Sequence, residues 1–140
     1  MAKQTTKQIG DLGESLAEKY LKRRGWHILA RNFKAKGGEI DIIGFRFGTL
    51  VYFEVKTRSG DGFGSPADAV DGEKLFHIRT AARQFIQLYG EFGRLPVTYP
   101  FGIEGKRAIH RERIDVIEVY LTDKSQKINH IKNAFETKML

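Results

Sequence analysis

The sequence predicts one α/β (α+β) domain, in which a mixed central sheet is flanked by helices. Three observations support this fold class. The length of 140 residues suits a single domain. Apolar residues recur with helical spacing in two segments and alternate in strand-like segments between them. The order helix, three strands, helix, strand allows the third and fourth strands to pair in parallel through a helical crossover.

The first helix is expected over about residues 6–24, followed by a short strand in the segment "WHILARNF". Thr5 and Gln8 have the spacing of a capping box, and Gly25 can end the helix. Small residues on one side would let this helix approach the sheet closely. The apolar stripe of the helix consists of Ile9, Leu12, Leu16, Ala17, Tyr20 and Leu21.

The next segment, "GGEIDIIGFRFGTLVYFEVKTRSG", predicts a β-hairpin with strands at about 39–46 and 50–57. A tight turn at Phe47 and Gly48 would place Asp41 opposite Glu54 and Glu39 opposite Lys56. A three-residue loop would break this register. Strict alternation would also place Ile40 and Ile42 on one face of the first strand, with Glu39 and Asp41 on the other.

A glycine-rich connection at 60–72 leads to a second amphipathic helix that spans about residues 75–89. Asp71 is a candidate N-cap and Gly90 a stop signal. "IDVIEVYL" predicts a further strand, and the spacing of Ile128, Ile131 and Phe135 predicts a short helix within the C-terminal segment 123–140. The whole chain, 1–140, is expected to be one domain with its core at about 6–122.

The formal net charge of +7 and the pI of about 9.7 favour a polyanionic partner, with nucleic acid first. The alternative is a soluble protein with a generally basic surface. The absence of cysteine excludes disulfides and thiolate zinc sites. No segment resembles a signal peptide or a membrane span, so we expect a soluble cytoplasmic protein without a membrane partner.

The predicted hairpin carries charges that suggest a metal-dependent reaction. Two carboxylates that face each other repel, and a divalent cation such as Mg²⁺ or Mn²⁺ between Asp41 and Glu54 would remove this penalty. Lys56 follows Glu54 on the same face, about 6.6 Å along the strand. Two acids and an ammonium group suit phosphodiester hydrolysis. The alternative is an ordinary charged pair on a solvated sheet face, but Asp41 between isoleucines is unusual in a strand.

"GEIDII" followed by "FEVKTRS" resembles the PD-(D/E)xK signature of restriction-endonuclease-like nucleases, with Asp41 as its first acid and Glu54-Val55-Lys56 as its ExK element. From about Ile9 to Leu121, the order of motifs is similar to the YraN-like family of small bacterial proteins. These motifs are a glycine-containing first helix, "GEID", "EVK" and a basic second helix. That family is similar in fold to archaeal Holliday junction resolvases, which act as dimers, so the resemblance also implies a homodimer.

The resemblance implies roles for further residues. The Val55 carbonyl and Glu14 would join Asp41 and Glu54 at the metal, although Glu14 is otherwise explained as a solvated helix acid. Lys56 would orient the attacking water, and Glu39 would tune Lys56 or bind a second metal. Lys74 would contact a phosphate or be an ordinary surface lysine. Asp115 would be structural or would support the site residues from behind. The backbone of the nucleic acid would be held by Lys34, Lys36, Arg58 and the segment 94–113.

The leading hypothesis is therefore a metal-dependent nuclease that acts on DNA, with branched or structured DNA as the suggested substrate. A second hypothesis is a non-catalytic nucleic-acid-binding module on a nuclease scaffold, and a third is an interaction subunit of a larger complex. The aromatic residues mostly fit apolar faces, so the sequence alone gives no support for a base-stacking platform.

Overall fold

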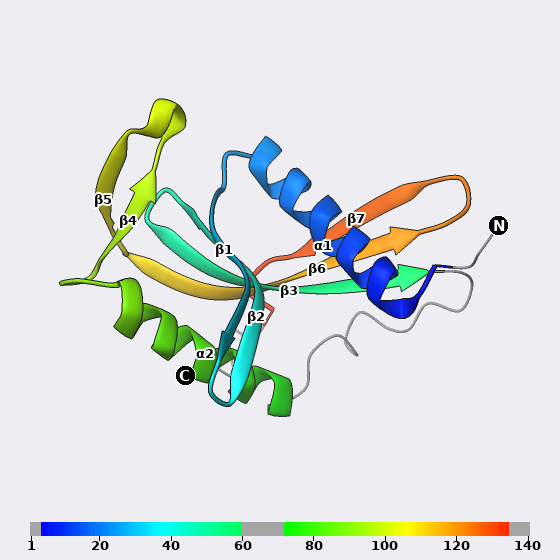
Figure 1. The fold of residues 1–140 in the computed structure, drawn as a ribbon, viewed down its shortest axis with the longest axis horizontal. Coiled ribbons are helices and arrows are strands. Elements are labelled where there is room, and N and C mark those ends of the chain that lie inside the picture. The colour runs from blue at the N-terminus through cyan, green and yellow to red at the C-terminus, as the bar shows by residue number, and fades with distance from the viewer. Residues whose placement is uncertain (1–3, 60–71, 135–140) are drawn as a thin grey trace.

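A computed structural model describes residues 4–59 and 72–134. A five-stranded mixed sheet in the order β1-β2-β3-β6-β7 has helices α1 and α2 on opposite faces (Figure 1). The fold class expected from the sequence is therefore confirmed. The elements are α1 (Thr6–Arg23), β1 (His27–Ala35), β2 (Gly38–Arg46), β3 (Thr49–Ser59), α2 (Gly72–Tyr89), β4 (Arg94–Thr98), η2 (Pro100–Gly102), β5 (Glu104–Ala108), β6 (Arg111–Leu121) and β7 (Gln126–Ile131).

Both ends of α1 form as the sequence predicts. The Thr5 side chain accepts a hydrogen bond from the Gln8 amide, and the Gln8 side chain accepts one from the Thr5 amide. These two bonds satisfy amides that lack partners within the helix. The chain leaves the helix through Gly25, whose φ of 84° is a left-handed conformation that glycine adopts without strain. The expected cap of α2, Asp71, lies outside the described residues.

The β2–β3 hairpin has the predicted register. Arg46 pairs with Thr49 and Ile42 with Phe53, across a two-residue turn. Both turn residues have positive φ, 48° for Phe47 and 77° for Gly48. This turn geometry matches the twist of the flanking strands and fixes the register of the hairpin.

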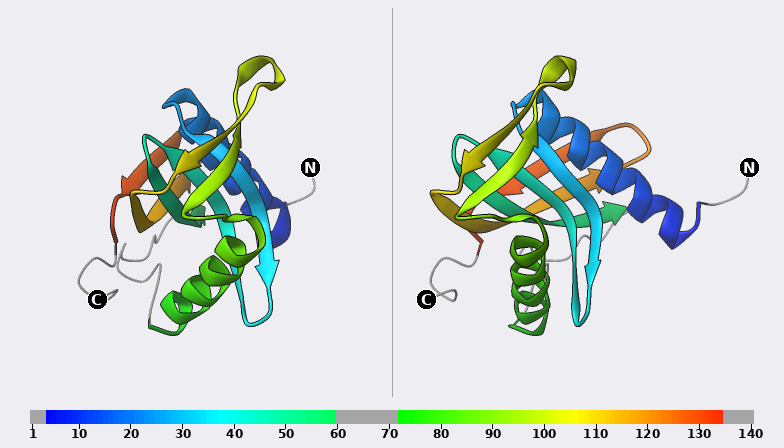
Figure 2. Two further views of the ribbon diagram at one scale, coloured as in Figure 1. Left: turned by 90° about the vertical axis from the view of Figure 1, so that its left-hand side faces the viewer. Right: turned by 60° about the vertical axis from the view of Figure 1, so that its left-hand side comes forward.

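After α2, the chain returns to the sheet as β6, which pairs in parallel with β3 along the full length of both strands. The crossover expected between these strands is therefore present. It also contains a small two-stranded sheet, β4–β5, where the sequence analysis placed only a basic segment. This hairpin stands beside the main sheet and extends beyond it (Figure 2).

The predicted C-terminal helix is wrong. Residues 126–131 form strand β7, which pairs antiparallel with β6 from Val116–Ile131 to Leu121–Gln126. A tight turn at residues 122–125, in which the Thr122 amide donates to the Ser125 carbonyl, reverses the chain. The open edge of β6 then supplies backbone partners that a short helix could not use. Phe135 lies outside the described residues.

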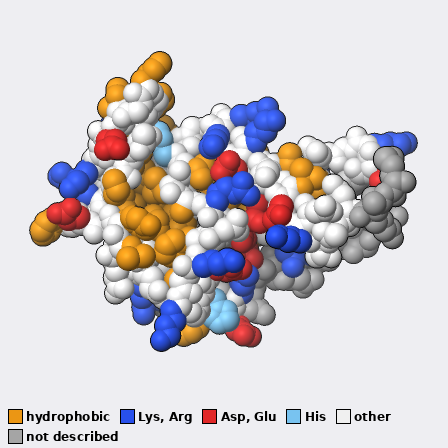
Figure 3. Space-filling model, in the orientation of Figure 1, with side chains coloured by type: hydrophobic (Ala, Val, Ile, Leu, Met, Phe, Trp, Pro, Cys, Tyr) orange, Lys and Arg blue, Asp and Glu red, His pale blue; other side chains and the backbone are white. Residues whose placement is uncertain are grey.

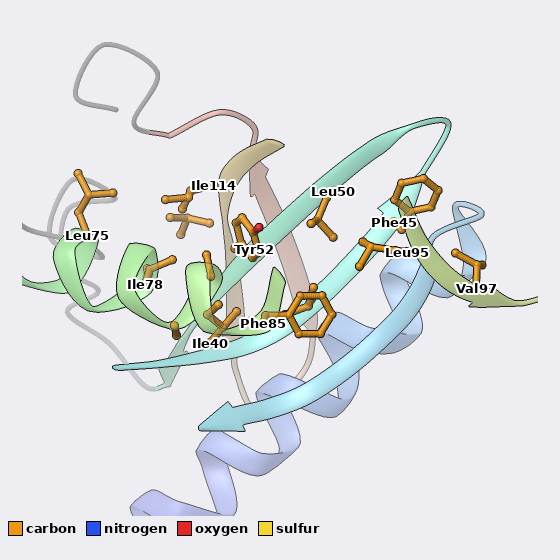
Figure 4. Packing of buried hydrophobic residues seen from close by; sticks show 14 residues of the cluster. Ile40, Phe45, Leu50, Tyr52, Leu75, Ile78, Phe85, Leu95, Val97 and Ile114 are labelled. Carbon is orange, nitrogen blue, oxygen red and sulfur yellow. The ribbon is translucent and has the colours of Figure 1, made fainter. Parts of the chain in front are cut away.

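The core consists of two apolar clusters, one on each face of the sheet. The cluster between the sheet and α2 includes Tyr52, Ile78 and Phe85 (Figure 4), and the cluster under α1 includes Leu21, Phe53 and Ile117. Because both faces are covered, β3 is almost continuously buried from Leu50 to Glu54. No helix within the described ranges 4–59 and 72–134 is long and apolar enough to cross a membrane.

Gly13 allows α1 to lie directly on β3. A Cβ atom at Gly13 would be 1.8 Å from Thr57 Oγ1 and 2.9 Å from Thr57 Cβ, so rotation of the threonine would not remove the clash. We therefore predict that Gly13→Ala lowers the free energy of unfolding by about 1–3 kcal/mol, measured by urea denaturation.

Gly10→Ala is the matched control on the same helix. A Cβ at Gly10 meets nothing within 4 Å, and alanine favours a helix by up to about 1 kcal/mol relative to glycine. Gly10→Ala should therefore be neutral or stabilising. Equal effects of the two substitutions would contradict the close approach of α1 to β3.

Candidate metal site and nucleic-acid surface

Asp41 ends the pairing between β2 and β3. The ladder stops at Ile42–Phe53, and beyond it the Val55 amide donates to Asp41 Oδ2 at 2.8 Å. The Asp41 carboxylate thus accepts the hydrogen bond that a backbone carbonyl would accept in a regular ladder. Side-chain alternation along β2 also changes here: Ile40 belongs to the cluster under α2, whereas Ile42 belongs to the cluster under α1. The expectation that Ile40 and Ile42 share one face is wrong, because it assumed an uninterrupted strand.

The structure brings Glu54 to Asp41, as the register predicted. Only 6% of Glu54 is exposed, and its Oε2 atom is buried without a hydrogen-bond partner among the described residues. Burial, followed by the negative charge of Asp41, raises the pKa of Glu54 to about 8. Burial also raises the pKa of Asp41, although the Val55 amide opposes this change. The interaction between the two carboxyl groups raises the pKa of Glu54 and lowers that of Asp41, so it favours a proton on Glu54.

The cation beside Glu54 is Lys74, from the first turns of α2. Its Nζ lies 3.1 Å from Glu54 Oε1. Burial alone would lower the pKa of Lys74, but the charge of Glu54 and a hydrogen bond to it prevail and raise the pKa. The sequence analysis considered Lys74 only as a phosphate contact or a surface lysine. The available signal was that Lys74 precedes Leu75, an apolar residue of α2 that packs against the sheet.

Two further acids extend the negative field around the pair. Glu14, on α1, has its pKa raised by burial and then by the charge of Asp41, and its Oε1 atom is buried without a hydrogen bond among the described residues. Glu39 is exposed on β2, and its charge also contributes to the raised pKa of Asp41. Glu14, Glu39, Asp41 and Glu54 therefore form one electrostatic group drawn from α1, β2 and β3.

These acids do not form a ready-made metal cage. Within residues 4–59 and 72–134, no three Asp, Glu or His side chains converge closely enough to hold a metal ion. The described residues do offer two facing carboxyl groups, a buried oxygen atom on Glu54 and another on Glu14 that lack partners. These are hard oxygen donors of the kind that Mg²⁺ and Mn²⁺ accept, with water completing the coordination.

The predicted pairing of Glu39 with Lys56 does not form in the ladder. Glu39 is instead the cross-strand partner of Lys34 on β1, because β2 and β3 stop pairing at Ile42–Phe53. Lys56 is half-buried on β3. Thr57 faces α1, so alternation places Lys56 on the opposite face, which it shares with Glu54.

Three of the predicted site residues line one surface hollow of about 490 Å³: Lys34, Glu39 and Lys74. Lys36 is exposed beside it, where its backbone exchanges two hydrogen bonds with the Gln84 side chain of α2. Figure 3 shows acidic and basic side chains interleaved across the middle of one face of the molecule. Arg58 differs from the lysines, because only 11% of its side chain is exposed and it lies 3.7 Å from Glu118.

Asp115 is structural, as expected. It is fully buried, accepts two hydrogen bonds from Arg113 and one from the Asn133 amide, and lies 2.7 Å from His130 Nε2. Burial would raise the pKa of Asp115, but these hydrogen bonds prevail and lower it. The network ties the end of β7 to β6 and lies on the α1 face of the sheet, whereas Glu54 faces α2.

Comparison with known sequences finds a family match over most of the chain. The pattern of the "Uncharacterised protein family UPF0102" matches residues 13–119. A UPF0102 protein of Alkaliphilus oremlandii is 42% identical over 92% of this chain and 98% of its own length. One of Caldanaerobacter subterraneus is 38% identical over 96% of this chain and its full length, and one of Clostridium botulinum is 38% identical over 93% and 95%.

The raised pKa of Glu54 predicts how stability depends on pH without metal. Its usual pKa of 4.5 becomes about 8 in the folded protein, so folding takes up a proton between these values. The stability from this group is fully present below pH 4.5 and is lost as pH rises through about 8. In a chelator, the free energy of unfolding of the wild type should therefore fall between pH 5 and 9 by about 2–4 kcal/mol more than that of Glu54→Gln.

Urea denaturation at several pH values measures this difference, and the exposed acid variant Glu104→Gln is the control. The control should keep the wild-type pH dependence. Parallel curves for wild type and Glu54→Gln would show that Glu54 does not take up a proton on folding.

Proposed function

We infer that the chain, which belongs to the uncharacterised protein family UPF0102, is a metal-dependent nuclease that hydrolyses phosphodiester bonds of DNA. Branched or structured DNA is the proposed substrate. The observation that carries this proposal is the pair formed by half-buried Asp41 and buried Glu54 at the point where the β2–β3 ladder ends. A purely structural role would not require two facing acids whose charged forms destabilise the fold.

The residues present fit a divalent cation. Asp41 and Glu54 would hold it, with the Val55 carbonyl as a third donor and Glu14 close enough to influence it electrostatically. Their oxygen atoms favour Mg²⁺ or Mn²⁺ over softer metals. When bound, such an ion supplies positive charge at the scissile phosphate and lowers the pKa of a coordinated water.

Two lysines of the chain, Lys56 and Lys74, would bind the phosphate of the substrate. Lys56 lies on the same face as Glu54, so its ammonium group would orient the attacking water and stabilise negative charge on the phosphate oxygens. Lys74 pairs with Glu54 in the metal-free protein. Once a divalent cation takes over that role, Lys74 would contact a phosphate of the substrate. Glu39 would tune these ammonium groups electrostatically.

The surface around the acids supports nucleic acid as the substrate. Four acids gather in one electrostatic group in a chain whose net charge is +7, so the excess positive charge lies elsewhere. Lys34, which lines the hollow, and Lys36, which is exposed beside it, would hold the DNA backbone. A homodimer and a cytoplasmic location belong to this proposal, since the resolvase resemblance implies the dimer and the sequence shows no signal-peptide or membrane-span pattern.

Two observations favour a second function, a non-catalytic nucleic-acid-binding module. Lys74 already neutralises Glu54, and no cluster of three metal-binding side chains is assembled in the described part of the chain. Such a module would bind nucleic acid in a salt-dependent way and would be indifferent to chelators. The same protein could then act as an interaction subunit of a larger complex.

Asp41→Asn separates these functions. Asparagine can still accept the Val55 hydrogen bond, so the hairpin is preserved while the charge is removed. We expect metal-dependent cleavage to fall by about 10²–10³-fold, because charge stabilisation at the phosphate is lost. Labelled four-way junction, flap, single-stranded and duplex DNAs, each with Mg²⁺, Mn²⁺ or chelator, measure the cleavage.

The exposed acid variant Asp123→Asn, on the β6–β7 turn, is the control and should cut at the wild-type rate. Cleavage by Asp41→Asn at the wild-type rate would refute the metal site. Salt-sensitive binding without cleavage, in both wild type and variant, would instead support the binding module.

Substitution of Lys56 and substitution of Lys34 should affect different steps, the cleavage rate and DNA binding respectively. Lys56→Met is expected to lower the maximal cleavage rate by about 10²-fold or more, with Mn²⁺ binding retained, because its ammonium group acts on the reacting phosphate. Lys34→Met should leave the rate at saturating DNA unchanged. It should reduce the slope of log affinity against log salt by about one, the loss of one backbone contact. A normal maximal rate for Lys56→Met would remove that residue from the reaction.

A further inference from the structure

A second basic surface lies at the opposite end of the β2–β3 hairpin from Asp41. There the Phe47–Gly48 turn, together with β4 and β5, borders a groove of about 650 Å³. Four of its lining residues are permanent cations, Arg46, Arg94, Lys106 and Arg107. Lys106 forms an ion pair with Glu91 at 3.0 Å, but no Asp or Glu is among the lining residues themselves. A groove of this composition favours an anionic ligand.

Aromatic rings lie beside these cations. The Arg46 guanidinium lies 4.5 Å from the Trp26 ring centroid and 5.9 Å from that of Phe47. Arg107 lies 5.1 Å from the Tyr99 ring centroid and donates a hydrogen bond to the Tyr99 hydroxyl group. Guanidinium groups held in this way present flat, cationic surfaces next to flat apolar ones.

Phe47 is an almost fully exposed residue of this groove. Its side chain is 95% exposed, although water disfavours an apolar ring, and its φ of 48° is a left-handed conformation that bulky residues rarely adopt. Asparagine or glycine would suit the turn better. Packing and local conformation do not favour a phenylalanine at this position, and its place beside the cations of the groove is what suggests a ligand that stacks on its ring.

We propose that this groove binds a single-stranded segment of DNA, with bases stacked on Phe47 and Tyr99 and phosphates held by Arg46, Arg94, Lys106 and Arg107. This inference rests on the proposed function in that it takes DNA as the ligand, and it adds that the substrate carries unpaired bases. Alternating aromatic and cationic groups are the general means by which proteins hold single strands without reading their sequence.

The composition of the groove favours a single strand over the alternatives. A duplex hides the faces of its bases, so it would use the four cations but not the exposed ring. A second copy of this chain would bring its own net charge of +7 against an already basic surface. On the side of the molecule where the β4–β5 hairpin lies, Figure 3 shows exposed hydrophobic side chains with Lys and Arg at their edges.

The groove and the acid pair are held at a fixed separation. Phe47 follows Asp41 by six residues on the same hairpin, which corresponds to about 20 Å along the strand. A DNA with a single-stranded arm next to a duplex could therefore occupy both sites at once. This arrangement defines the substrate class as DNA with a junction between single-stranded and double-stranded regions.

Phe47→Asn tests the stacking without disturbing the turn, because asparagine tolerates the left-handed conformation. Phe92→Asn is a matched control: Phe92 is also 95% exposed, has a φ of 51° and precedes a glycine, but does not line the groove. Both substitutions are made in the Asp41→Asn background. Fluorescence anisotropy in chelator then measures binding of a labelled single-stranded oligonucleotide and of a duplex of the same length.

Phe47→Asn should weaken single-strand binding about tenfold and leave duplex binding unchanged. Phe92→Asn should change neither. Arg94→Gln should weaken both and reduce the salt slope by about one. Equal effects of Phe47→Asn and Phe92→Asn, or equal losses for single strand and duplex, would overturn the inference. So would the absence of single-strand binding, or a dimer in sedimentation that Phe47→Asn converts to monomer.

Failure here is distinguishable from failure of the nuclease proposal. The binding experiment uses a charge-neutralised acid site and no metal, so it does not depend on catalysis. If the wild type cuts DNA but Phe47→Asn does not specifically weaken single-strand binding, the nuclease proposal stands and the groove proposal fails. If the wild type cuts no DNA but Phe47→Asn weakens single-strand binding as expected, the groove proposal stands and the nuclease proposal fails.

Discussion

The hydrogen bond from the Val55 amide to Asp41 is the interaction on which the site depends. An aspartate in a buried strand is normally unfavourable, but here its carboxylate substitutes for a backbone acceptor at the point where β2 and β3 stop pairing. The same bond fixes the carboxylate beside Glu54. It also marks the point where β2 changes the face to which its side chains point, which lets Ile40 pack under α2 while Ile42 packs under α1.

Burial of this acid pair makes the metal-free protein less stable than its packing would allow. The pKa values of Asp41, Glu54 and Glu14 are all raised, which means that the surroundings disfavour their charged forms. Lys74 offsets part of this strain at Glu54, and the hydrogen bond from Val55 offsets part at Asp41. Both partners come from elements that the core already holds rigidly, so the remaining repulsion persists and favours any cation that enters.

Local sequence signals predicted the elements whose geometry is set locally. The capping box of α1 and the turn at Phe47 and Gly48 involve neighbours in the chain, and the turn alone fixed which residues face Asp41. The remaining features depend on distant partners. Ile128 and Ile131 fit a helix or a strand equally, and only the open edge of β6 decides for the strand. The sequence could not show that Glu39 pairs across the strands with Lys34. The β2–β3 ladder ends where the Asp41 side chain accepts a hydrogen bond from the Val55 amide, and local patterns do not reveal that bond. Lys74 reaches Glu54 only because α2 packs across the sheet.

The β2–β3 hairpin also explains how two separate surfaces can serve one substrate. Its strands are buried on both faces, with Ile42, Leu50 and Phe53 fully enclosed, so the hairpin cannot bend or slide without exposing the core. The acid pair near one end and the Phe47 turn at the other are therefore parts of one rigid element. If both proposals hold, the distance between the stacked bases and the cleaved phosphate is set by strand length, and a flexible single strand is the ligand that adapts to it. Selectivity would then come from where the strand meets a duplex rather than from base sequence.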